Sequence, residues 1–174
     1  MEPKYQLVIA GKNIVLNAKG FIEELAYDPV LQEQELSLTK GIDKLNNSFG
    51  TPALLATVHN GQPIVIDGQS KELSQQLETA LRRFTATSGT DALSVFLTKD
   101  GKFAAYHYFR DGKLLRSVDK AGAEPQTDGI DIPYESTGTD PYLVLTAFCD
   151  SWLVLQQLPW TVYRLESKMA HEQE

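Results

Sequence analysis

The stretch LSVFLTKDGKFAAYHYFRDGKLLRSV, residues 93–118, contains three runs rich in apolar residues, separated by two similar turns. Both turns contain Asp-Gly-Lys, at positions 100–102 and 111–113. Asp-Gly favours tight turns because both residues tolerate the positive φ that short hairpin loops need. The runs at 93–98, 103–109 and 114–118 are therefore predicted to form an antiparallel three-stranded meander.

Two further hairpins are predicted on the N-terminal side of this meander. Asn60-Gly61 lies between the apolar runs 53–58 and 63–66, and Asn-Gly is the strongest short-range hairpin signal. The alternating residues 5–10, followed by Gly11-Lys12 and by Ile14-Val15-Leu16, also indicate a short hairpin.

Helices are predicted from apolar residues that recur at the helical period and from capping signals. The expected helices cover residues 21–26, 70–85 and 141–158, a last short strand covers 160–165, and 33–49 stays undecided. The sequence thus predicts an α+β fold, with residues 1–165 as a single domain. Its antiparallel sheet carries hairpins and the three-strand meander, and about three helices pack on it. Residues 166–174 form a charged tail that we expect to fray.

Composition excludes several classes of function. Sixteen basic residues oppose 23 acidic ones, with a net charge of -7, so a broad nucleic-acid-binding face is not expected. The single cysteine, Cys149, rules out an internal disulfide, and no cofactor or metal motif is present. The start of the chain does not have the pattern of a signal peptide, and polar residues interrupt the apolar stretch 142–158. We therefore expect a cytoplasmic protein with no cofactor, no membrane span and no nucleic-acid partner.

The acidic excess is concentrated in the last third of the chain. Residues 121–174 carry nine acids and two bases, and no Lys or Arg occurs from Ala121 to Tyr163. Three interpretations of this run stay open. It is a solvated loop, a site for a hard cation such as Ca²⁺, or a surface that faces a basic partner.

The strand predicted over 103–109 is crowded with aromatic residues. Strict alternation places Phe103, His107 and Phe109 on one face and Tyr106 and Tyr108 on the other. The face outside the core is either an aromatic recognition patch or a set of cross-strand pairs beneath a helix.

Two residues in this part of the chain have chemistry that a catalytic site could use. In one interpretation His107 is a general base or a metal ligand. In the other, which is favoured, it is a polar residue that packs across the strands. Cys149 also has two interpretations. In one it is a nucleophile, with His107 as the base and Asp150 as the orienting group. In the other, which is favoured, it is a thiol packed in the core. The helix predicted from Tyr142 to Leu158 is apolar on most sides, so it is a core helix or is exposed to a partner.

The chain resembles, in size, acidity and lack of catalytic motifs, the small immunity proteins of bacterial toxin-delivery systems. The resemblance implies a non-catalytic cytoplasmic domain that binds one toxin and blocks the active site of that toxin. The expected toxin has a basic surface, and a nuclease is the candidate. The predicted partner-binding residues are the acids of the run and three tyrosines, namely Glu124, Asp128, Asp131, Glu135, Asp140, Tyr106, Tyr108 and Tyr134. The alternative is an enzyme or small-ligand-binding protein whose site is assembled from His107, Tyr106, Tyr108 and Cys149.

Overall fold

The computed structural model describes residues 3–12, 14–25, 29–46, 53–68, 71–98, 100–120 and 124–165. The strands within these residues are β1 (Pro3–Ala10), β2 (Pro29–Leu36), β3 (Ala53–His59), β4 (Gln62–Asp67), β5 (Ala92–Thr98), β6 (Phe103–Arg110), β7 (Lys113–Asp119), β8 (Gln126–Gly129) and β9 (Trp160–Leu165). The helices are α1 (Ala18–Glu24), α2 (Leu38–Asn46), α3 (Lys71–Ser88), α4 (Pro141–Phe148) and α5 (Trp152–Gln156), with a 3₁₀ turn, η1 (Pro133–Glu135).

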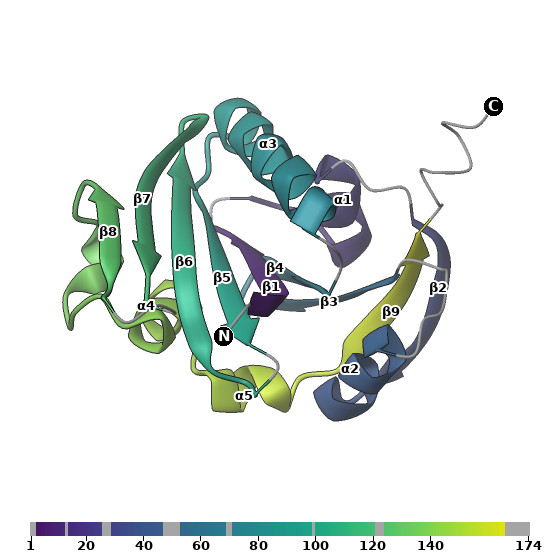
Figure 1. The fold of residues 1–174 in the computed structure, drawn as a ribbon. Coiled ribbons are helices and arrows are strands. Elements are labelled where there is room, and N and C mark those ends of the chain that lie inside the picture. The colour runs from purple at the N-terminus through teal and green to yellow at the C-terminus, as the bar shows by residue number, and fades with distance from the viewer. Residues whose placement is uncertain are drawn as a thin grey trace.

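All nine strands join one antiparallel sheet, in the order β2-β9-β3-β4-β1-β5-β6-β7-β8. The α+β fold with an antiparallel sheet, predicted from the sequence, is therefore confirmed. In Figure 1 the sheet curves across the molecule, with β8 at one end and β2 at the other.

Each face of the sheet is covered by its own helices and has its own apolar core (Figure 1). On one face α1 and α3 pack against the strands, with Phe21, Leu81 and Phe84 among the buried residues. On the other face α2, α4 and α5 cover a core that includes Tyr106, Phe148 and Trp160. A sheet covered on both faces needs apolar residues at successive strand positions, which explains why Leu7, Val8, Ile9 and Ala10 are all fully buried.

Three of the four predicted hairpin turns are confirmed. Asn60 and Gly61, with φ of 51° and 79°, connect β3 to β4, and Asp111 and Gly112, with φ of 53° and 77°, connect β6 to β7. Gly101, with φ of 80°, lies in the turn between β5 and β6. These positive angles explain why Asn, Asp and Gly occupy the turns.

The predicted N-terminal hairpin is wrong. β1 does not pair with residues 14–16, which form no strand, but lies between β4 and β5 at the middle of the sheet. After Lys12 the chain leaves the sheet and reaches α1, where the Asn17 side chain accepts a hydrogen bond from the Gly20 N–H at 2.7 Å. The alternation in 5–10 identified a strand, but its partners are far away in the sequence.

The long helix predicted over 141–158 is two helices. α4 ends at Phe148, and α5 begins after Ser151, whose side chain accepts a hydrogen bond from the Val154 N–H at 3.3 Å. Because Ser151 restarts the helix, the apolar residues of 142–158 do not all face the core as those of one continuous helix would. Leu155 is fully buried, whereas the side chain of Leu153 is 64% exposed.

The structure also resolves segments that the sequence left open. Residues 33–49 were undecided, and their described part contains the end of β2 and then α2. Residues 120–139, for which no helix or strand was predicted, contain β8 and η1 in their described part. The predicted tail, 166–174, lies outside the described residues. Within the described residues, no helix combines the length and the apolar character that crossing a bilayer requires.

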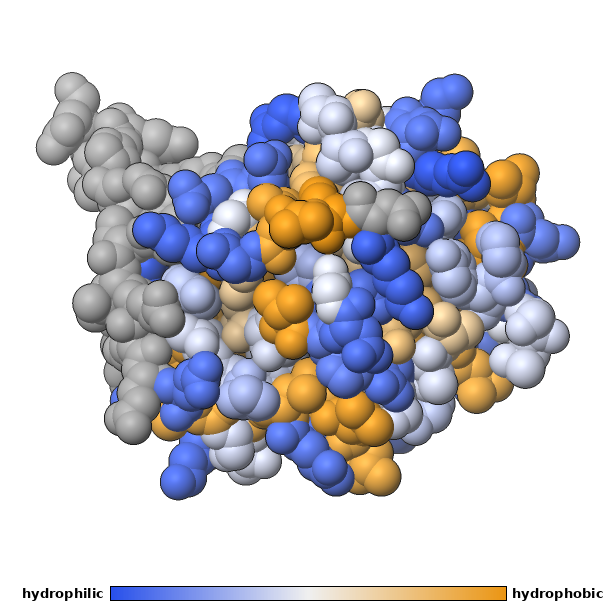
Figure 2. All heavy atoms as spheres, turned by 180° about the vertical axis from the view of Figure 1, so that it is seen from behind, coloured by the Kyte–Doolittle hydropathy of each residue, from blue (hydrophilic) through white to orange (hydrophobic). Residues whose placement is uncertain are grey.

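Figure 2 shows the molecule from behind, with apolar side chains in separate patches between polar ones. Such scattered patches are normal on folded proteins and do not by themselves mark an interface.

Candidate functional site

The acidic run lies around β8, the last strand at one end of the sheet (Figure 1). All four residues of β8 are exposed, and so are Glu124 before the strand and Ile130 and Asp131 after it. The side chain of Asp131 is 97% exposed, and Ile130 is 60% exposed. One edge of β8 pairs with β7, and the other edge pairs with no described strand.

Glu135 belongs to the same run but has a different environment, because its side chain is only 6% exposed. It accepts hydrogen bonds from the Tyr106 hydroxyl and from Arg116 Nε, the latter at 2.9 Å. Its second oxygen accepts from the Ile132 N–H at 3.1 Å. Glu135 therefore joins η1 to strands β6 and β7 from the inside, and a partner protein cannot reach it in this structure.

The contacts of Glu135 also alter its titration. Burial acts to raise the pKa of its carboxyl, but the hydrogen bonds from Tyr106 and Arg116 outweigh this effect. The pKa of Glu135 therefore lies below its ordinary value, and the group is charged at neutral pH. For Tyr106, burial and the adjacent Glu135 carboxylate both raise the pKa of the hydroxyl, so it stays protonated.

Asp140 has a local structural role at the start of α4. Its side chain accepts a hydrogen bond from the Tyr142 N–H at 2.8 Å, in the N-cap position. Pro141 follows as the first helical residue, where the missing N–H costs nothing. Among the acids of the run, Glu124, Asp128 and Asp131 are exposed and have no capping or buried role in the described part of the chain, whereas Glu135 is buried and Asp140 is exposed but caps α4.

The three tyrosines predicted as anchors are not surface anchors in this structure. Tyr106 is fully buried, and Tyr108 is 4% exposed. Tyr134 is half-buried, and its ring packs against Phe148 with 4.9 Å between centroids. Sequence alternation placed Tyr106 and Tyr108 on one face of β6, but it did not show that helices cover both faces.

Phe103 was predicted on the wrong face of β6. The pairing of β5 with β6 shifts register between Phe96 and Leu97, so the simple alternation is interrupted before Phe103. Phe103 packs instead on the face of Tyr106, where its ring meets Tyr142 and Trp152 at 5.5 and 5.6 Å between centroids.

The possible catalytic group of Cys149, His107 and Asp150 is not assembled. Cys149 packs against the core that contains Tyr106, whereas the ring of His107 meets Phe109, which belongs to the opposite core. Burial raises the pKa of Cys149 to about 12, with a further contribution from Asp150, so the sulfur is a thiol at neutral pH. Burial also lowers the pKa of His107, which is neutral at pH 7.

The partner of Asp150 is instead His59, a residue that sequence analysis did not place in any site. Its Nε2 lies 2.8 Å from Asp150 Oδ2, and this hydrogen bond is the largest cause of a lowered Asp150 pKa. The pair joins the end of β3 to the link between α4 and α5.

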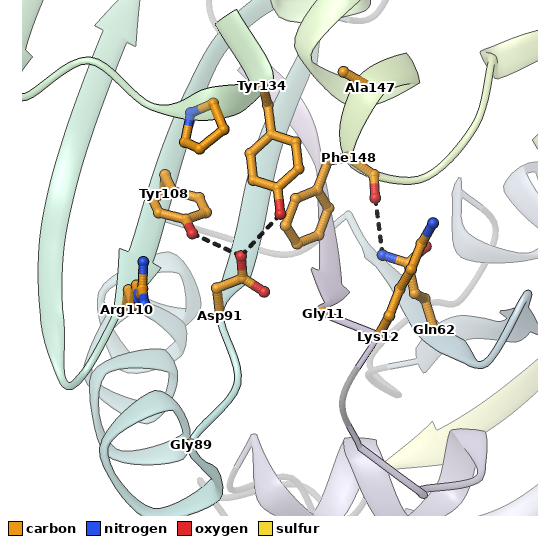
Figure 3. A pocket seen from close by; sticks show the side chains of 11 residues that line it. Gly11, Lys12, Gln62, Gly89, Asp91, Tyr108, Arg110, Tyr134, Ala147 and Phe148 are labelled. Atoms are coloured by element: carbon orange, nitrogen blue, oxygen red, sulfur yellow. Dashed lines mark hydrogen bonds between the residues drawn. The ribbon is translucent and has the colours of Figure 1, made fainter.

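A pocket of about 340 Å³ opens where β1, β5, β6, η1 and α4 converge (Figure 3). Asp91 lies inside it, and Asp91 Oδ2 accepts hydrogen bonds from the Tyr108 hydroxyl at 2.6 Å and the Tyr134 hydroxyl at 3.2 Å. Figure 3 shows Arg110 on one side of Asp91 and Lys12 on the other. Sequence analysis named both tyrosines but missed Asp91, because the chain gives no local signal that links position 91 to positions 108 and 134.

The described residues contain no group of three or more His, Cys, Asp or Glu side chains that could hold a metal ion. Comparisons with protein-family models, with curated proteins and with solved structures gave no match.

Proposed function

We propose that this protein binds another protein through the surface around β8, as a stoichiometric inhibitor of the immunity type that neutralises a bacterial toxin in the cytoplasm. The observation that carries the proposal is that Glu124, Asp128 and Asp131 are exposed together on and beside an outer strand. The sequence around them, from Ala121 to Tyr163, contains no Lys or Arg. A partner with a basic surface complements these charges.

The backbone of β8 adds a second means of contact. An outer strand presents N–H and C=O groups that can pair with a strand of a partner. The exposed Ile130 side chain, between the charged Asp128 and Asp131, offers an apolar contact at the same place. Charged side chains on an outer strand also discourage pairing with a second copy of the same chain, because the like charges repel.

A nuclease toxin is the partner class that fits this surface. The cleft of a nuclease must be positive to hold the phosphate backbone. Carboxylates placed in or beside that cleft compete with phosphate and exclude the nucleic acid. In this proposal Glu135 and Asp140 hold the segment in shape, and the exposed acids make the contact.

The proposal is tested with a variant of the exposed acids that carries Glu124→Gln, Asp128→Asn and Asp131→Asn. The matched control carries Glu23→Gln, Glu24→Gln and Asp100→Asn, which removes the same charge from exposed positions elsewhere. Each protein is used to capture a partner from the native host, and the partner is then purified and assayed for nuclease activity.

We expect the parent and the control to abolish that activity at equimolar concentration. The variant of the exposed acids should require about ten times more protein, because complementary charges speed association. The proposal is contradicted if all three proteins inhibit equally or if the captured partner has no activity that the chain inhibits.

A further inference from the structure

The pocket around Asp91 has the features of a small-molecule site that is separate from the surface around β8. Its walls come from segments far apart in the sequence, including Gly11, Gln62, Asp91, Tyr108 and Phe148. Its volume of about 340 Å³ lies within the range of pockets that hold small ligands. Tyr108 and Phe148 supply aromatic walls, and a few polar groups lie between them, which is the usual composition of such sites.

Asp91 is the central polar group of this pocket and is held in place from two sides. The Tyr108 and Tyr134 hydroxyls both donate to Asp91 Oδ2, which fixes the carboxylate plane. Asp91 Oδ1 lies close to Gly11, where an added Cβ atom would be 2.0 Å from it. Oδ1 accepts no hydrogen bond from the described residues, so it is available to a donor from a ligand.

A second polar side chain, Gln62, forms part of the pocket wall. Gln62 is fully buried, and its Nε2 donates to the carbonyls of Ala10 and Phe148 at 3.1 and 3.0 Å. These two bonds fix the orientation of the amide, and its Oε1 has no hydrogen-bond partner among the described residues. Because Oε1 has almost no accessible surface, it is closed to a ligand, and Gln62 contributes a fixed polar part of the wall.

The rim of the pocket carries two cations. Lys12 and Arg110 are both exposed and lie on opposite sides of Asp91 (Figure 3). Lys12 makes no ion pair with the described residues, and Arg110 makes only a long one, 3.8 Å, with its neighbour Asp111. The charged side chains that line the pocket are thus two cations and one carboxylate, an arrangement that suits a ligand with a negative group and a donor.

We propose that the pocket binds a free α-amino acid. The ammonium group donates to Asp91 Oδ1. The carboxylate faces Lys12, and the side chain lies against the rings of Tyr134 and Phe148. An amino acid carries its ammonium and carboxylate on one carbon, so it satisfies the central acceptor and a rim cation at the same time.

The test is a titration of the isotope-labelled full chain, followed by NMR, with each proteinogenic L-amino acid in turn up to about 10 mM, the range of weak ligands. We expect at least one of them to cause saturable shifts of the Gly11 and Gly89 amides and of the Gln62 side-chain amide. The residues of β8 should not shift, which separates this site from the surface proposed to bind a protein.

Two variants and two matched controls locate the binding. Lys12→Gln and Asp91→Asn remove one charge each from the pocket, whereas Lys102→Gln and Asp100→Asn remove the same charges from an exposed turn. Each pocket variant should weaken binding about tenfold or more, because a charged hydrogen bond is lost, and each control should leave it unchanged. Lys12 is exposed, so Lys12→Gln remains a valid test even if Asp91→Asn does not fold.

Inorganic phosphate and ribose 5-phosphate are titrated in parallel. Saturable binding of these anions without binding of any amino acid would show an anion site and overturn the proposal. The absence of any saturable shift at the pocket, or a shift that Lys12→Gln and Asp91→Asn both leave unchanged, would overturn it as well.

Discussion

Glu135 and Asp131 belong to the same acidic run, and both carboxylates approach Arg116, yet they occupy opposite environments. Glu135 Oε2 lies 2.9 Å from Arg116 Nε and is buried, whereas Asp131 Oδ1 lies 3.6 Å from Arg116 Nη2 on a side chain that is 97% exposed. The first pair connects η1 to the sheet, and the second is a surface contact that is worth little. A run of like charges in a sequence can therefore contain both buried residues that hold the fold together and residues that stay exposed to solvent.

The largest expected effect is on the free energy of unfolding, which substitution of these two acids should change by very different amounts. Glu135→Gln should lower the free energy of unfolding by about 3 kcal/mol, because it leaves the Arg116 guanidinium, which is 10% exposed, without its buried counter-charge. Asp131→Asn, the matched control, should change it by less than about 0.5 kcal/mol. Urea unfolding of the three proteins measures both values. Equal effects of the two substitutions would show that the buried pair has no special role.

A smaller effect is expected in the pH dependence of the same measurement. The pKa of Glu135 is lower in the folded protein than its ordinary value of 4.5, so the unfolded chain binds the proton more readily. The stabilisation by Glu135 is therefore complete above pH 4.5 and is lost as the pH falls through the lower, folded-state pKa.

The stability difference between the parent and Glu135→Gln should accordingly stay constant between about pH 7 and pH 5 and shrink at lower pH. Denaturant unfolding at a series of pH values follows this difference. A difference that grows as the pH falls below 4.5 would contradict the assigned direction of the pKa shift.

Local sequence signals predicted the parts of the fold that depend on neighbouring residues. The turns at Asn60-Gly61 and Asp111-Gly112 and the last strand at 160–165 agree with the structure, because turn chemistry and apolar runs act over a few residues. The position of β1 between β4 and β5 was not predicted, since its partners are set by long-range pairing that a local pattern does not encode.

The candidate sites show the same limit. The sequence identified the acidic run as a feature, but only the structure separates Glu135 from Asp131, because Tyr106 and Arg116 come from other strands. Asp91, the centre of the pocket, gave no signal in the sequence for the same reason. Its two hydroxyl donors lie 17 and 43 residues away in the chain.

The central claim, that exposed acids around β8 guide a basic partner, is tested most directly by the rate of association with the captured partner. The rate is measured for the parent, for the Glu124→Gln, Asp128→Asn, Asp131→Asn variant and for the charge-matched control, at ionic strengths from about 50 to about 300 mM. The account predicts that the parent and the control associate more slowly as salt rises. It also predicts that the variant starts about tenfold slower at low salt and depends little on salt. If the variant keeps the parent's association rate and salt dependence, the acids around β8 are only solvated surface residues, and the proposed contact surface is wrong.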